Sequence, residues 1–158
     1  MTTPLDWTDV ASIRENLVAG LIDKTQARIL DAADVGARSA IAQLTDDELV
    51  RLAKSSEPMG YRLGNTARAL AKTDKRFEVA LRIYDSLLSV PVEQLGPTTG
   101  TNALMWVQND EHKLGPMPDR ARRYLDHFLP YGVENTAIFI NAVFVLIELG
   151  ELDRAVEQ

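Results

Sequence analysis

Residues 64–91 read GNTARALAKTDKRFEVALRIYDSLLSVP. The segment holds two runs of apolar residues with the three- and four-residue spacing of amphipathic helices, separated by a short polar stretch. The apolar positions are Ala67, Leu70 and Ala71 in the first run and Phe77, Leu81, Tyr84 and Leu88 in the second. The alternation typical of a strand is not found in either run. The segment therefore predicts two antiparallel helices joined by a tight turn.

The same helical spacing continues in both directions along the chain. We expect helices over residues 8–20, 24–33, 37–43, 45–53, 58–72, 75–90, 99–110, 118–128 and 135–149, with one more beginning at residue 151. Thr45-Asp46-Asp47-Glu48 has the form of a capping box, and Pro58 suits the first turn of a helix. The sequence thus predicts an all-α fold of about nine to ten helices.

A degenerate internal repeat groups these helices into pairs. One unit contains Ala80-x3-Tyr84 followed by Pro91, and the last contains the turn Leu149-Gly150-Glu151-Leu152-Asp153-Arg154-Ala155. These features resemble the tetratricopeptide repeat, whose signature is W-x2-L-G-x2-Y, then A-x3-F, then P. The resemblance covers about residues 60–158 and implies stacked antiparallel helix pairs, that is, an α-solenoid. An unrelated helical bundle is the alternative architecture.

The repeats depart from that signature in several places. The position of the opening aromatic residue is occupied by Gly64, Gly100 and Phe139, and the middle unit has extra residues at 111–117. Residues 1–56 are expected to form N-terminal helices of no recognised type. They would share a single domain, residues 1–158, with the helix pairs of residues 57–158, the last of which is incomplete. Ala80, Ala121 and Ala155 are expected where paired helices cross closely, because a small side chain permits close approach.

The repeat register also predicts a binding surface. If the first helix of each pair faces a concave side, its outward residues can hold a peptide or protein partner. The predicted binding residues are Arg62, Asn65, Lys72, Asn102, Met105, Gln108, Asn141 and Phe144. The same asparagines could instead satisfy helix ends or neighbouring turns.

Composition limits the classes of function. The chain has 158 residues, a net charge of -6 and no cysteine, so a nucleic-acid partner and Cys-ligated zinc are both disfavoured. Its most apolar run, residues 137–149, is shorter than the roughly 20 residues of a membrane span. No targeting signal is seen, and we expect a cytoplasmic protein without a membrane partner.

Known catalytic, metal-binding and nucleotide-binding motifs are not found in the sequence. His112 and His127 have no metal-ligand spacing and are expected on the surface, and no nucleotide-binding glycine loop occurs. Trp106, in an apolar helix, is expected in the core. We therefore expect no cofactor, no metal and no catalytic residues.

Protein binding is the function that these features favour. The expected role is a non-enzymatic adaptor or scaffold of the tetratricopeptide-like kind. The alternative is an inhibitor or immunity-type protein that covers a toxin or an enzyme. An enzyme with dispersed catalytic residues is less favoured. An enclosed pocket with convergent carboxylates would be evidence for an enzyme.

The helix expected over residues 135–149 is apolar on nearly all sides. Such a helix is normally buried, yet the segment that follows it is too short to cover it. We expect another subunit, a partner protein or further residues of the chain to cover this helix. A homo-oligomer formed through it is one possibility.

Overall fold

The fold is all-helical, as the sequence predicted. A computed structural model describes residues 5, 6, 8–20 and 35–157, and this part of the chain contains no strand. Its helices are α1 (Val10–Val18), α3 (Val35–Ala42), α4 (Asp46–Lys54), α5 (Glu57–Lys72), α6 (Phe77–Leu87), α7 (Pro97–Gln108), α8 (Pro118–Phe128), α9 (Thr136–Glu148) and α10 (Leu152–Glu157). Three 3-10 turns, η2 (Val92–Gln94), η3 (Asp110–His112) and η4 (Leu129–Val133), connect the later helices.

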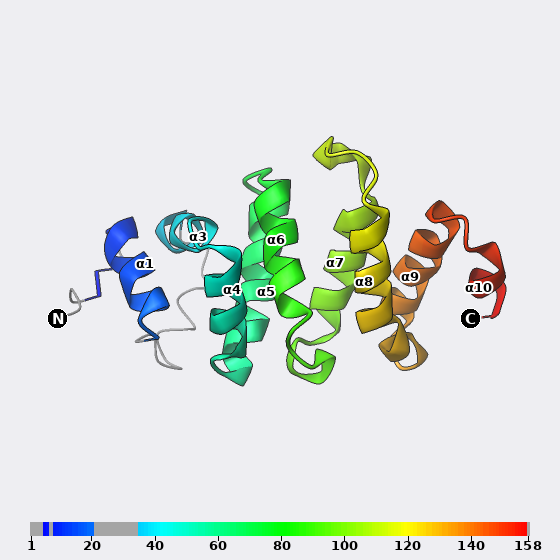
Figure 1. Ribbon diagram of the computed structural model, residues 1–158, viewed down its shortest axis with the longest axis horizontal. Coiled ribbons are helices and arrows are strands. Elements are labelled where there is room, and N and C mark those ends of the chain that lie inside the picture. The colour runs from blue at the N-terminus through cyan, green and yellow to red at the C-terminus, as the bar shows by residue number, and fades with distance from the viewer. Residues whose placement is uncertain (1–4, 7, 21–34, 158) are drawn as a thin grey trace.

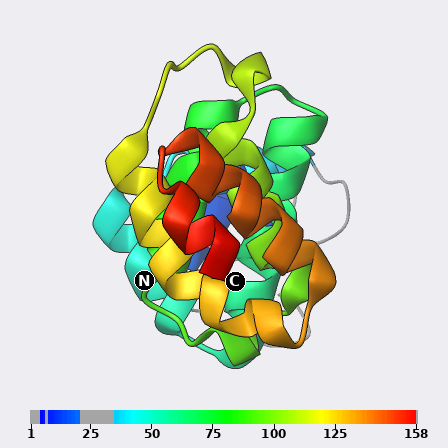
Figure 2. The same cartoon turned by 90° about the vertical axis from the view of Figure 1, so that its right-hand side faces the viewer.

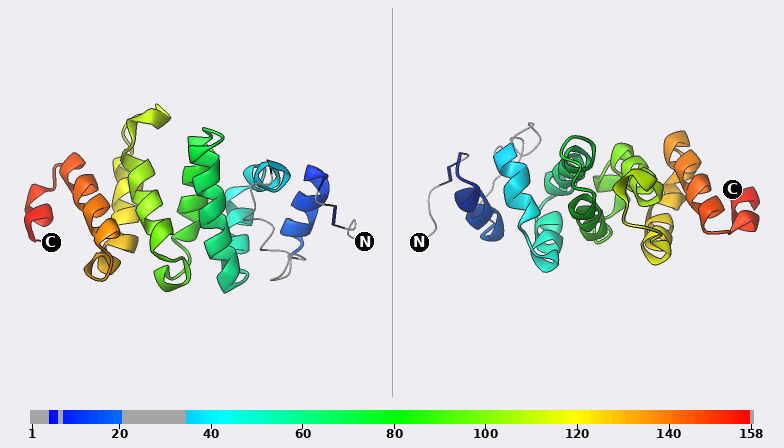
Figure 3. Two further views of the ribbon diagram at one scale, coloured as in Figure 1. Left: turned by 180° about the vertical axis from the view of Figure 1, so that it is seen from behind. Right: turned by 90° about the horizontal axis from the view of Figure 1, so that it is seen from above.

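Consecutive helices lie side by side along the long axis of the molecule. Figure 1 shows α1 near one end of this array and α10 at the other. One row contains α5, α7 and α9, in which α7 contacts both of its neighbours. In the other row α4 contacts α6, and α8 reaches α6 through side chains. The view from behind and the view from above in Figure 3 show the same succession of helices.

The helix starts follow the local signals in the sequence. The Thr45 N–H donates to Glu48 Oε2 (2.9 Å), and the Glu48 N–H donates to Thr45 Oγ1 (3.2 Å). These bonds form a capping box at the start of α4, which satisfies two backbone donors that the helix itself leaves unpaired. Pro58 lies in the first turn of α5. The capping box and the proline start were therefore both correctly predicted.

Buried aliphatic and aromatic side chains run through the array as one core. Ala80 and Tyr84 on α6 are fully buried, and Ala121 on α8 is 6% exposed. Trp106 is 5% exposed and packs against Phe77, which confirms the prediction that it belongs to the core. The side chain of Ala155 lies outside what the structure describes.

Two glycines allow neighbouring helices to approach closely. A Cβ atom on Gly64 of α5 would lie 2.5 Å from Thr99 Oγ1 of α7. A Cβ atom on Gly100 of α7 would lie 2.9 Å from a ring carbon of Phe128 and 3.2 Å from Ile138 Cδ1 of α9. Gly64 thus contacts the residue before Gly100, and Gly100 contacts the residue before Phe139. The contact of α5 with α7 and that of α7 with α9 are therefore alike at these two glycines.

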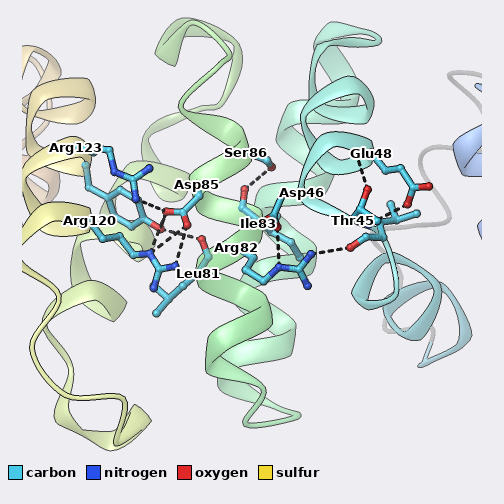
Figure 4. Close-up of polar contacts among 12 residues, drawn as sticks. Thr45, Asp46, Glu48, Leu81, Arg82, Ile83, Asp85, Ser86, Arg120 and Arg123 are labelled. Atoms are coloured by element: carbon cyan, nitrogen blue, oxygen red, sulfur yellow. Dashed lines mark hydrogen bonds and ion pairs between the residues drawn. The ribbon is translucent and has the colours of Figure 1, made fainter.

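Polar side chains join α4 to α6 and α6 to α8 (Figure 4). Arg82 Nε donates to Asp46 Oδ1 at 2.8 Å, and Arg120 Nη2 donates to Asp85 Oδ2 at 3.0 Å. In each pair the acid lies on the earlier helix and the arginine on the later one. The partners are separated by 36 and 35 residues. Similar links therefore recur from one helix to the next in this row.

Some details differ from the sequence-based expectations. The expected helix over residues 24–33 lies outside the described residues, so the count of nine to ten helices stays a prediction. The segment from Pro91 to Pro97 was expected as a plain loop but contains η2, and α7 begins at Pro97 rather than near Thr99. Among the described residues, no helix combines the length and apolar character needed to cross a membrane.

Candidate functional site

The eight predicted binding residues all lie on α5, α7 and α9. Three come from α5, where Lys72 is exposed in the last turn while Arg62 and Asn65 are half-buried. The guanidinium carbon of Arg62 lies 5.4 Å from the centre of the Tyr61 ring, within range of a cation–π contact. Lys72 is thus open to a partner, whereas the guanidinium group of Arg62 lies against the ring of Tyr61.

The structure brings Gln108 and Asn141 together between α7 and α9. Gln108 Nε2 donates to Asn141 Oδ1 at 3.3 Å. Asn102 Nδ2 donates to the Thr98 carbonyl and Asn141 Nδ2 to the Ala137 carbonyl, each at 2.9 Å and four residues back along its own helix. Asn102 and Asn141 therefore have equivalent geometry, and each uses part of its amide for its own helix.

One face of α9 is apolar and exposed to solvent. Ile140 is 47% exposed, Phe144 is 54% exposed and Ile147 is 47% exposed. Their spacing of four and three residues places them on one side of the helix. We call these three residues the α9 face. Figure 2 views the array end-on, with α9 and α10 nearest to the viewer.

The α9 face has a counterpart on α7. In the register that aligns Asn102 with Asn141, the residues of α7 equivalent to the α9 face are Thr101, Met105 and Gln108. All three are half-buried, and Gln108 contacts α9 directly through Asn141. The α9 face thus aligns with residues that are covered more fully on α7.

A cleft of about 300 Å³ lies where the ends of α7 and α9 meet the start of α8 and the loop between α7 and α8. Its apolar wall is formed by Val107, Met117, Ala121, Val145 and Leu149. Its polar lining comes from Gln108, Asp110, His112 and Glu148. Sequence reasoning missed this site, because its residues come from three helices and a loop.

His112 is not on the surface, contrary to the sequence-based prediction. The side chain is 9% exposed and packs edge-on against Phe77. The Leu114 N–H donates to His112 Nδ1 at 3.0 Å, and burial lowers the pKa of the imidazole, partly opposed by the charge of Asp110. The ring therefore stays neutral at pH 7, with its proton on Nε2. His127, the other histidine, is half-buried.

The carboxylates of the cleft influence each other. Desolvation against the wall and the negative charge of Asp110 raise the pKa of Glu148. Neither carboxylate has a hydrogen bond or an ion pair within the described part of the chain. Gln108 Oε1 is buried and likewise accepts no hydrogen bond from the residues that the structure describes. Gln108, Asp110 and Glu148 thus contribute acceptor oxygens to the cleft.

Metal binding has no support in the described ranges 5–6, 8–20 and 35–157, which contain no group of three or more metal-ligating side chains.

Comparison of the chain with protein-family models, with curated proteins and with solved structures finds no match.

Proposed function

We propose that this chain is a degenerate tetratricopeptide-like stack that acts as a non-enzymatic protein-interaction module. In this proposal the α9 face binds a helix of a partner protein. The observation that carries the proposal is the exposure of Ile140, Phe144 and Ile147 at positions that are half-buried in the equivalent helix α7.

The spacing of side-chain contacts supports the repeat. Arg38 and Asp74 are bonded at a separation of 36 residues, as are Asp46 and Arg82. Asp85 and Arg120 follow at 35 residues, close to the 34-residue length of a tetratricopeptide repeat. The link from Arg122 to Glu151 is shorter, at 29 residues, in the short last pair.

The same contacts extend the proposed stack toward the N-terminus. Arg38 lies on α3 and Asp46 on α4, within the residues for which the sequence suggested no recognised type. Arg38 is 5% exposed and bonds Asp74 with two N–H groups, at 2.8 and 3.1 Å. We therefore infer that the stack extends toward the N-terminus as far as α3 and α4.

The chemistry of the α9 face favours an apolar helix as its occupant. Covering a large apolar side chain is worth roughly 1.5–3 kcal/mol, so three adjacent ones supply a substantial part of a binding energy. A helix laid beside α9 would extend the row formed by α5, α7 and α9, and helices that bind in grooves commonly use anchors spaced by three and four residues. In this position α9 lies between the bound helix and α7, so Asn102, Met105 and Gln108 of α7 and Arg62, Asn65 and Lys72 of α5 would meet only a partner that extends back along the row.

The proposal predicts that one charge on the α9 face abolishes partner capture. Immobilised wild-type protein should capture a protein from a lysate of the cells that make it. Phe144→Asp should reduce that capture by about 100-fold, because it removes an apolar contact and buries a charge. Val133→Asp is the matched control, since Val133 is 92% exposed but lies outside the α9 face; it should capture as wild type does.

The stated occupant can also be distinguished from a second copy of the chain. A partner protein predicts that the isolated chain sediments as a monomer over a wide range of concentrations. A dimer that Phe144→Asp dissociates would instead make self-association the function of this face. Equal capture of the partner by wild type and by Phe144→Asp would show that the α9 face does not bind it.

A further inference from the structure

The cleft between the ends of α7 and α9 has a composition that fits one kind of side chain. We propose that it binds the guanidinium group of an arginine side chain presented by a partner protein. The assignment relies on the proposed function only in making a protein the source of the arginine. The cleft itself is separate from the α9 face and can be tested without a partner.

Hydrogen-bonding capacity is the first argument. Gln108 Oε1 is buried and has no donor among the described residues, while the carboxylates of Asp110 and Glu148 lie at the exposed edge of the cleft and have neither a hydrogen bond nor an ion pair there. All three groups are acceptors. A guanidinium carries five N–H donors in a plane and cannot accept, so it complements such a lining better than a neutral or anionic group does.

The charge balance around the cleft is the second argument. Its two carboxylates are negative, and His112 stays neutral because it is buried, so the imidazole does not repel a bound cation. Arg120 lies nearby and donates to Met117 Sδ, but it does not line the cleft and is paired with Asp85 at 3.0 Å, which Arg123 also approaches at 3.7 Å. The lining of the cleft therefore carries a net negative charge.

The shape of the wall is the third argument, and it separates arginine from lysine. Val107, Val145 and Leu149 form an apolar side, and the planar ring of His112 lies at another. Arginine has an apolar stem and a flat, weakly hydrated head that stacks on planar groups, whereas the ammonium of lysine is a compact and strongly hydrated charge. A volume of about 300 Å³ is at the lower end of ligand pockets and suits a side chain rather than a large ligand.

The test uses methionine methyl groups as reporters. Met117 lines the cleft, while Met59 is 2% exposed in α5 and reports on the fold. Protein labelled with 13C at the methionine methyl groups is titrated with N-acetyl-arginine amide and followed by NMR. We expect a saturable shift at Met117 and no shift at Met59. N-acetyl-citrulline amide, which has the same shape without the charge, should leave Met117 unchanged.

Substitutions in the lining locate the binding. Asp110→Asn and Glu148→Gln should each weaken binding of the arginine probe by roughly fivefold, the effect of losing one partly exposed ionic contact. Glu111→Gln is the control, because Glu111 is the exposed acid next to Asp110 and does not line the cleft. It should bind as wild type does. An unchanged Met59 signal shows that each variant is folded.

Four results would overturn the assignment. One is the lack of a saturable shift at Met117, another is an equal shift with the citrulline compound, and the third is binding that neither carboxylate substitution weakens. Equal affinity for N-acetyl-lysine amide would also overturn it, since the cleft would then recognise charge without recognising the guanidinium. None of these results bears on capture through Phe144, so the two proposals fail independently.

Discussion

Replacing Asp85 with alanine should lower the free energy of unfolding by about 2–3 kcal/mol, because it leaves a half-buried arginine without its counter-ion. The single N–H of Arg120 Nε is shared between both carboxylate oxygens of Asp85, at 3.1 Å from each, and Arg120 Nη2 donates to Oδ2 at 3.0 Å. Tyr124 Oη lies 2.9 Å from Asp85 Oδ1. The side chains of Asp85 and Arg120 are each 23% exposed, so solvent replaces the lost contacts only in part. Urea unfolding followed by circular dichroism measures the loss.

Asp46→Ala is the matched control for this prediction. Asp46 makes a similar contact between α4 and α6, with Arg82, but its side chain is 80% exposed. Exposed ion pairs contribute about 1 kcal/mol at most, so Asp46→Ala should cost less than that. If the two alanine variants lose the same free energy of unfolding, the contacts of Asp85 with Arg120 and Tyr124 do not hold α6 and α8 together.

Replacing Gly100 with valine should destabilise the fold by about 2–3 kcal/mol through overpacking. The new Cβ atom would lie 2.9 Å from the Phe128 ring and 3.2 Å from Ile138, and these side chains are 0% and 1% exposed. Neither has room to withdraw without shifting a helix. The gain in helix propensity on replacing glycine is below about 1 kcal/mol and does not offset this cost. Thermal or urea unfolding measures the net effect.

Ala137→Val controls for adding a branched side chain to a helix. Ala137 is exposed in the first turn of α9, so the substitution adds volume without overpacking. It should cost no more than about 0.7 kcal/mol, the difference in helix propensity. Unfolding of Gly100→Val that matches Ala137→Val would show that α7 does not approach α8 and α9 as closely as the structure has it.

The all-helical fold was predictable because its signals are local. The apolar spacing in residues 64–91 and the Thr45 capping box involve residues within one or two turns of each other, and local interactions fix them. The apolar character of α9 was also predictable, since its sequence is apolar on almost every side of the helix. The repeat register placed Phe144 among the outward residues, and its side chain is 54% exposed. The exposure of Ile147 on the same side was not predicted, because it depends on how α9 packs against α7, α8 and α10.

The cleft was not predictable for a physical reason. Asp110 and Glu148 lie far apart in sequence, and the loop that brings Met117 to the cleft includes backbone with positive φ at Lys113 (55°) and Gly115 (78°). A pattern of residue types does not specify the path of such a loop. The extra residues at 111–117 were the available signal, and they indicated an insertion without showing what it lines.

Site-specific photo-crosslinking tests the central claim most directly. The claim is that the α9 face binds a helix of another protein. A benzophenone amino acid is placed at position 144, at position 147 and, as the control, at position 133, and the cells that make the protein are irradiated. The account predicts that positions 144 and 147 give the same crosslinked partner, attached through a helical segment, and that position 133 does not. Crosslinks at 144 that match those at 133, or that join only two copies of this chain, would contradict it.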